Sequence, residues 1–359
     1  MKENKVNLSM SAIDTYVATN LPDSKETKMR NKNYMYWGSD NKYPCYLWDL
    51  YTNAATLQSI INGTSDFICG NDVIINVERF KSKINNNGDT ILDIVRKITM
   101  DKLIFGGYAL QIIRSYDGSV SEIYALDLMK LRTNDKAEIF YYSNDWTEWS
   151  PKVIELPKFD PNKMQSSSVF YNKGSITRGV YPIPVYGAAI ISCELEKAIN
   201  EFHLNSINNG FMSSAIINFN NGQPNDEQKA EIEKLINEKF SGYQNASRIL
   251  ISYNDSDENK TTIERLDGDD FDSKYEALST RTREQIFTAF RANSVLFGIN
   301  YSSGFNENEF NEAFKLYNRT VVRPIQNELI DSFDKILNQV GSITIVPFSL
   351  ESNAETNVN

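Results

Sequence analysis

The sequence predicts an α+β protein, with mixed helices and antiparallel strands in its first half and long helices in its second half. Three observations predict this class. A helical apolar run from Ile91 to Leu103 ends at two glycines and is followed by strand-like runs. A proline-containing junction at residues 179–184 precedes a long helical run. Two more helical runs, over residues 271–292 and 309–339, are joined by a small polar loop.

Composition indicates a folded chain. The 359 residues are 41% hydrophobic and 12% aromatic, which is ordinary for a globular protein. No run approaches the roughly 20 apolar residues of a membrane span, and the N-terminus leads into no signal-peptide core, so we expect an intracellular product without membrane contact. Cys45, Cys69 and Cys193 are far apart and odd in number, which favours buried reduced thiols over disulfides or a zinc site.

The first elements follow from local patterns. Residues 1–33 carry few apolar anchors and are expected to form an arm or a loosely held tail. Residues 34–38 form an aromatic turn region, and the apolar spacing over Cys45–Ile68 predicts one helix. A loop rich in asparagine, residues 85–89, leads to a helix that Asp89 or Thr90 can cap.

A set of strands comes next. Gly106 and Gly107 stop the helix, and Tyr108–Arg114 reads as a strand. A turn at Asp117-Gly118 returns the chain along Val120–Leu126. Further strand-like pieces, expected to pair mostly antiparallel, lie at residues 138–142, 152–156 and 168–171.

The second half begins with a helix from about Val185 to Asn208. Ile191, Leu195, Ala198 and Phe202 repeat at helical spacing along it, with charged residues on the other faces. A compact α/β insert is expected beyond it, made of strands at residues 215–219, 248–251 and 262–264 and a helix at 227–240.

Catalytic patterns are scarce. The single histidine, His203, lies within the long helix and lacks the motifs of a nucleophilic site, so we interpret it as an ordinary helical residue. No phosphate-binding loop of the P-loop type is present. The acidic cluster from Glu264 to Asp272 could hold divalent ions as in nucleases. Because it directly precedes a helix, the capping of that helix is the favoured interpretation.

The order of elements carries more information than any one motif. Residues 290–298 form an aromatic stop ending at Gly298, residues 299–307 a Ser/Gly/Asn loop, and Pro324 lies inside the next helix. With Leu103–Leu110, the stop at residues 208–210 and the turn at 240–248, this order resembles tailed-bacteriophage portal proteins of the long-tailed-phage type.

The resemblance implies a portal-type fold with these parts in order. Residues 1–33 would be an N-terminal arm, 34–185 an α+β wing, 186–210 a stem helix and 211–266 a small α/β clip. Residues 267–292 would be the returning stem helix, 293–308 the tunnel loop, and 309–359 a long wing helix with a C-terminal strand returning to the wing. The helical crown would be absent or minimal.

The resemblance also implies a function without catalysis, cofactor or metal. A homododecameric ring would stand at one capsid vertex of the virion, after assembly in the bacterial host cytoplasm. Double-stranded DNA would pass through it, and it would contact the terminase large subunit, head-completion or adaptor proteins and the major capsid protein. The tunnel-loop residues facing DNA would be Asn300, Tyr301, Ser302, Ser303, Gly304, Phe305 and Asn306. The clip residues facing terminase or adaptors would be Gln223, Asn225, Glu227, Lys234, Tyr243 and Asn245.

The net charge of −10 bears on the same question. An acidic protein does not grip DNA by neutralising phosphates, but it can surround DNA that must stay mobile. Two alternatives stay open. One is a metal-dependent nucleic-acid enzyme using the Glu264–Asp272 cluster, and the other is a phage structural or adaptor protein without a channel.

Overall fold

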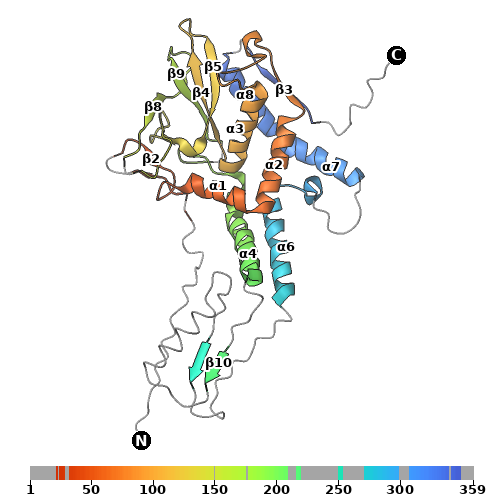
Figure 1. The fold of residues 1–359 in the computed structure, drawn as a ribbon. Helices are drawn as coiled ribbons and strands as arrows, with labels where there is room; N and C mark the ends of the chain where they lie inside the picture. Colours follow the sequence, from red (N-terminus) through yellow and green to blue (C-terminus); the bar gives the residue numbers. More distant parts are fainter. Residues whose placement is uncertain are drawn as a thin grey trace. The chain divides into compact units, whose positions relative to one another are not determined.

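The computed structural model describes residues 22, 24–28, 32–148, 150–174, 177–208, 216–219, 250–253, 271–298, 307–338 and 341–348. It is an α+β protein (Figure 1), as the sequence predicts. The chain divides into two compact units. The sheet unit comprises Met1–Asp49, Ile61–Val185 and Asn318–Asn359, and the helical unit comprises Leu50–Ile60 and Tyr186–Tyr317.

Antiparallel pairing builds the sheet unit. One three-stranded sheet has β4 (Tyr108–Arg114) between β5 (Val120–Leu126) and β9 (Ser167–Asn172). A second has β7 (Ile139–Tyr142) between β6 (Leu131–Thr133) and β8 (Ile154–Pro157). The expected strands are confirmed here. The C-terminal strand β12 (Ile343–Val346) pairs with β3 (Asp72–Ile75), a four-residue strand too short for the sequence pattern to reveal.

Helix α3 (Ile91–Phe105) covers β3 and β4 and has the predicted ends. Thr90 and Asp93 form a reciprocal capping box, which satisfies two N-terminal backbone donors. Gly106 ends the helix in a left-handed conformation with φ of 93°. A Cβ there would lie 2.2 Å from the carbonyl oxygen of Ile183, so only glycine fits where the proline junction crosses the helix end.

The C-terminal helical run, which the sequence predicts over residues 309–339 with Pro324 inside it, contains a π-helical turn. It consists of α7 (Glu307–Tyr317), a π-helical turn at Asn318–Val322 and α8 (Arg323–Ile336). Pro324 explains the change, because it has no N–H for the preceding turn and its ring would clash with that turn's carbonyl. The wider π turn relieves both problems.

A polar network fastens α8 to the sheet unit. The hydroxyl groups of Tyr108 and Ser332 lie 2.8 Å apart, and Asn172 donates to the same tyrosine oxygen at 3.2 Å. Lys102 of α3 donates to Glu328 at 2.6 Å, with the lysine side chain only 10% exposed. Because these buried and half-buried groups satisfy one another, they fix the orientation of α8 as well as its attachment.

The N-terminal predictions need two corrections. The helix expected over Cys45–Ile68 is two helices, α1 (Tyr43–Asn53) and α2 (Ala55–Cys69). The sequence hides the break because Ala54, only 1% exposed, keeps the apolar spacing intact across it. Cys69 and Cys193 are buried as expected, whereas Cys45 is exposed, since it projects from α1 on the side away from the buried Leu47.

Part of the predicted arm is described. Residues 24–28 are tied to the sheet unit, which fits an arm and not a loosely held tail. Strand β1 (Thr27–Lys28) pairs with β2 (Met35–Tyr36), and the carboxylate of Glu26 accepts a hydrogen bond from the backbone N–H of Tyr181 at 2.8 Å. The sequence signal was weak because these contacts are polar and backbone-mediated, so they leave no apolar pattern.

Trp37 of the predicted aromatic turn lies against a buried arginine, Arg132. Trp37 is 1% exposed and stacks on Tyr181 with ring centroids 4.7 Å apart. Arg132, also 1% exposed, donates to the side-chain and backbone oxygens of Asn41 and to the backbone oxygens of Met129 and Leu131. Burial lowers the pKa of this guanidinium, and the oxygens around it offset part of that cost. Nothing in the sequence marks Arg132 as buried.

Candidate functional site: the paired helices α4 and α6

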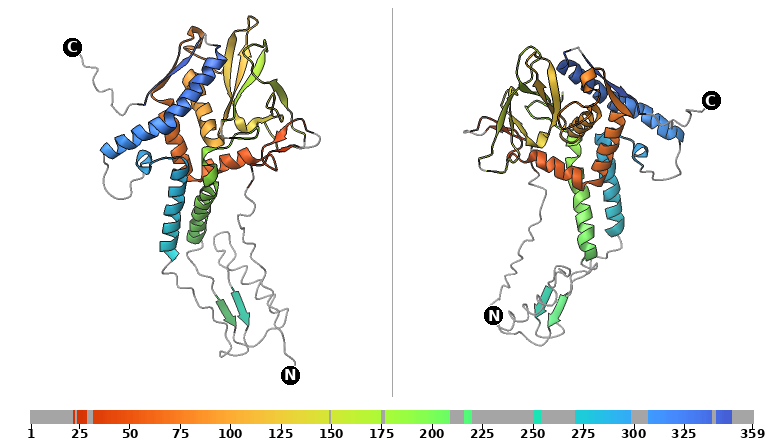
Figure 2. Two further views of the ribbon diagram at one scale, coloured as in Figure 1. Left: turned by 180° about the vertical axis from the view of Figure 1, so that it is seen from behind. Right: turned by 45° about the horizontal axis from the view of Figure 1, so that its top comes forward.

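Two long antiparallel helices dominate the helical unit. Helix α4 (Ile190–Asn208) follows a 3-10 turn at Val185–Ala189, and α6 (Phe271–Ala289) returns beside it in both views of Figure 2. Cross-helix contacts set the direction. Phe202 stacks on Tyr275 with centroids 5.1 Å apart, and the hydroxyl of Ser192 donates to Gln285 at 2.8 Å. These partners run in opposite sequence order, so the two helices are antiparallel.

The buried face of α4 is not the one that its apolar spacing predicts. The buried positions are Ser192, Cys193 and Ile199, and burial raises the pKa of the Cys193 thiol to about 12, which makes it inert. The apolar repeat that the sequence predicts lies on another side. Ile191 is 66% exposed and Phe202 is 42% exposed. We call Ile191, Leu195, Ala198 and Phe202 the α4 stripe.

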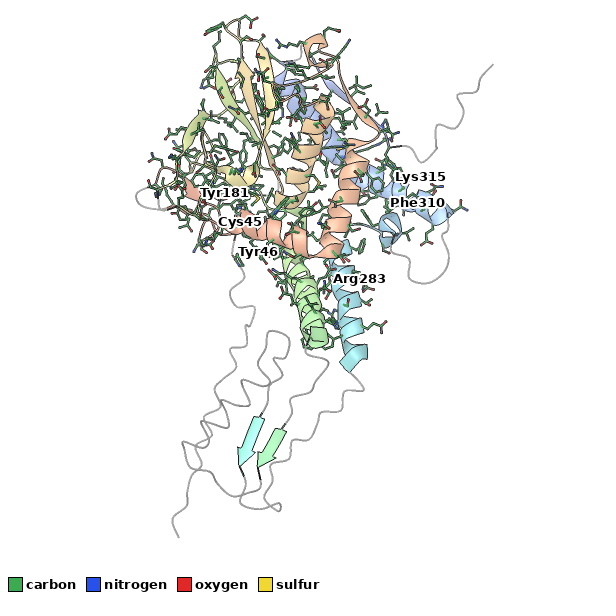
Figure 3. The ribbon with its side chains drawn as sticks, viewed as in Figure 1. Cys45, Tyr46, Tyr181, Arg283, Phe310 and Lys315 are labelled. Atoms are coloured by element: carbon green, nitrogen blue, oxygen red, sulfur yellow. The ribbon has the colours of Figure 1, made fainter. Side chains whose placement is uncertain are left out.

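A groove lies on a different side of the same helices. The carboxylate of Glu196 accepts from the backbone N–H of Thr56 at 3.1 Å and from its hydroxyl at 2.7 Å, so α4 caps the start of α2. Around this cap is a groove of about 320 Å³. Figure 3 labels Arg283, which lines it from α6. We call it the α2 groove; its lining residues are Ala55, Thr56, Ser59, Glu196, Ile199, Asn200, Ser279, Thr282 and Arg283.

The end of α6 turns the chain sharply. Arg291 has a positive φ of 53°, and the side chain of Asn293 caps a 3-10 helix at Ser294–Phe297 that ends at Gly298. Phe297 packs against Phe287 and Tyr317, with centroids 5.9 and 6.0 Å away. The first residues of the segment predicted as the tunnel loop are therefore an ordered turn.

The predicted site residues themselves lie outside the described residues. This holds for all seven tunnel-loop residues from Asn300 to Asn306 and for all six clip residues from Gln223 to Asn245. Of the segment predicted as the clip, the structure describes strands β10 (Ile216–Phe219) and β11 (Leu250–Tyr253), which pair in parallel.

The residues considered for catalysis are placed as follows. Within the described residues no group of three or more His, Cys, Asp or Glu could hold a metal ion, and no helix is long and apolar enough to cross a membrane. The Glu264–Asp272 cluster lies outside those residues, except that Asp272 belongs to the first turn of α6. His203 is exposed on α4 with its ring edge toward Tyr275, 5.6 Å between centroids.

Comparison with known proteins gives the class. A family model described as phage portal protein matches residues 79–352, which is more than half of the chain. No curated protein sequence matches. The chain belongs to the phage portal protein family, whose members are structural proteins and not catalysts.

Solved structures share this fold. A chain in the virion of a native gene transfer agent particle has a TM-score of 0.56 and 14% identity, over 84% of this chain and 83% of that one. A chain in the neck of an empty particle of that kind gives 0.56 and 13%, over the same shares. One in the native neck computed with C12 symmetry gives 0.53 and 14%, over 83% of each chain.

Proposed function

We propose that this chain is the subunit of a portal ring, a homododecamer at one vertex of a phage capsid. The genome enters and leaves the capsid through the bore of the ring. Family membership carries the proposal. The antiparallel α4/α6 pair and the C12 symmetry of a structurally similar neck support the ring and its number.

The apolar surface of α4 also supports oligomerisation. Ile191 of this helix is 66% exposed, and a large apolar side chain in such a position favours a surface that another copy covers. Helices of this length are marginal alone in water, so packing against neighbouring copies would hold them in register. A closed ring supplies such a neighbour to every subunit.

The remaining assignments follow from the family role. The loop at Asn300–Asn306 would line the bore with short polar groups that touch phosphates without trapping them, in keeping with the net charge of −10. The clip would bind the terminase large subunit and later the head-completion proteins, and the wing would contact the major capsid protein. The ring would be assembled in the host cytoplasm and remain in the virion. It would have no catalytic activity, and ATP hydrolysis would come from a partner.

Negative-stain imaging and native mass spectrometry of the purified full chain test the ring. We expect closed rings with twelve-fold symmetry and a matching mass. Monomers alone, across protein and salt concentrations, would contradict the proposal. Metal-dependent DNA cleavage that disappears in an Asp269→Asn/Asp270→Asn variant would favour the nuclease alternative instead.

A second experiment tests the loop. Shortening residues 301–306 should leave rings intact, because loop length enters closure entropy only logarithmically. Capsids assembled with that variant should package or retain less DNA than capsids with the full loop. Normal filling and retention would remove the tunnel-loop assignment, and loss of the rings would show that the loop is structural.

A further inference from the structure

Strand β8 forms an open edge of the sheet unit. The N–H of Lys158 donates to the carbonyl oxygen of Glu138 at 2.9 Å, and this bond sets the alternation of the β7–β8 ladder, so the backbone groups of Glu155 point away from β7. Among the described residues these groups have no backbone partner. Glu155 is exposed and Ile154 is 62% exposed, so another strand can reach this edge. Pro157 ends the open stretch, because it has no N–H to donate.

The two faces of β8 differ in polarity. Ile154 and Leu156 project on one face and Glu155 on the other, because side chains alternate along a strand. A strand that extends this sheet would cover Ile154 if it carried apolar residues at alternate positions. Polar or basic residues between them would lie beside Glu155.

The sequence contains a segment of this kind near its start. Residues 5–11, which we call the arm segment, read Lys-Val-Asn-Leu-Ser-Met-Ser and precede the part of the chain that the structure describes. Val6, Leu8 and Met10 alternate with polar residues, as in a strand with one apolar face. Lys5 belongs to the polar face, so its charge would complement that of Glu155.

The arm joins the sheet unit on the other side of β7 from the open edge. We call residues 24–28 the strap; its strand β1 pairs with β2. The hydroxyl of Tyr181, labelled in Figure 3, connects β2 to β6, because it donates to the carbonyl oxygen of Met35 and accepts from the N–H of Thr133 at 3.1 Å. Strand β7 then separates β6 from β8. A strand donor on one side and an open edge on the other are the two different patches that a head-to-tail contact in a ring requires.

We propose that the arm segment of one subunit adds as a strand to the β8 edge of the next subunit, so that each sheet unit passes one strand to its neighbour. This rests on the proposed function, since it takes a second copy of this chain as the donor. Residues 12–23, which link the arm segment to the strap, span up to about 40 Å when extended, several times the distance of about 4.8 Å between paired strands. Backbone hydrogen bonds would hold the added strand, and its alternating side chains would fix the register.

Cross-linking between two single-cysteine variants tests this contact. In the full chain carrying Cys45→Ser, which removes the exposed native thiol, one variant has Ser9→Cys in the arm segment and the other Glu155→Cys at the edge. When the two are co-assembled and treated with a short bis-maleimide, we expect covalent dimers. Each variant assembled alone should give no cross-link, and dimers from Ser9→Cys alone would overturn the proposal.

A chain that carries both cysteines shows which copy donates the strand. It should give a ladder of covalent multimers, because each subunit then links to both neighbours. Cross-linked monomers without multimers would show that the arm segment adds to its own β8 edge, and would overturn the exchange.

The matched control replaces Glu155→Cys by Thr344→Cys, an exposed strand position outside the sheet that contains β8, and should give no dimer with Ser9→Cys. Adding Leu8→Asp to the Ser9→Cys chain should lower the yield of dimers about tenfold, because a carboxylate would replace an apolar side chain beside Ile154. An unchanged yield would contradict the pairing of the apolar faces. Intact rings without dimers from the original mixture would overturn this contact but leave the portal ring standing. Absence of rings from the unmodified chain would overturn the proposed function and this inference together.

Discussion

Helices α8 and α4 have the same spacing of apolar residues, but these side chains are buried on α8 and partly exposed on α4. Leu329, Phe333 and Ile336 of α8 are 0%, 0% and 1% exposed, at positions i, i+4 and i+7. Ile191, Leu195 and Ala198 of α4 have identical spacing, yet Ile191 is 66% exposed. The pattern therefore predicts that a face will be covered, but not whether the same chain or another copy covers it.

Helices α8 and α4 also differ in the contacts that hold them within the subunit. Helix α8 adds a buried polar network to its apolar face, through Tyr108, Ser332 and Asn172. Helix α4 has Ser192, Cys193 and Ile199 at its buried positions, whereas Ile191 is 66% exposed and Phe202 is 42% exposed. The sheet unit should accordingly resist unfolding within one subunit, whereas the full stability of the helical unit should depend on assembly.

The largest loss of stability is expected at the core of α8. Phe333→Ala would leave a cavity at a position that is 0% exposed, and it should lower the free energy of unfolding by about 3–5 kcal/mol. Denaturant unfolding followed by circular dichroism measures this. Lys335→Ala, at an exposed position on the same helix, is the control and should change stability by less than about 0.5 kcal/mol. Equal effects for the two variants would contradict the burial of α8.

A smaller loss is expected from the polar network. Tyr108→Phe removes the oxygen shared by the buried Ser332 and the half-buried Asn172 and leaves both short of a partner, at a cost of about 1–3 kcal/mol. Tyr116→Phe, at a fully exposed tyrosine, is the control. If Tyr108→Phe unfolds at the wild-type denaturant midpoint, the network does not stabilise the attachment of α8.

The N-terminal cap of α3 should contribute less to the free energy of unfolding than the polar network does. Thr90→Ala removes the side-chain acceptor for the N–H of Asp93, and it should cost about 1 kcal/mol. Thr90→Ser keeps the hydroxyl and should retain most of that stability. Both are read from thermal unfolding, and an equal loss for the two variants would mean that the methyl group, not the cap, matters at this position.

The sequence predicted what depends on local chemistry. The helix ending at Gly106, the hairpin at Asp117-Gly118 and the existence of helices α4 and α6 were readable because capping, turns and apolar spacing act over a few residues. The family assignment from the order of elements is confirmed.

What the sequence missed depends on distant partners. The burial of Arg132 follows from oxygens of Asn41, which lies 91 residues away. Strand β3 forms because β12 pairs with it from the other end of the chain. Glu196 appeared as one charge among several on α4, and its capping of α2 has no local signature. The tunnel-loop and clip residues stay predictions.

The most direct test of the contrast between α4 and α8 is a variant that should hardly change the stability of a single subunit. Ile191→Glu places a charge where the side chain is already 66% exposed, so the free energy of unfolding of the lone subunit should change by less than about 0.5 kcal/mol. In a ring that buries the stripe, the same carboxylate would be desolvated without a partner, which costs far more. Native mass spectrometry should therefore show folded monomers in place of rings.

Ala277→Glu, an exposed alanine of α6 outside the stripe and the groove, should still assemble. If Ile191→Glu forms normal rings, the exposed face of α4 is not an interface, and the contrast with α8 is only a matter of surface composition. If it unfolds the subunit, Ile191 is packed within its own chain in solution.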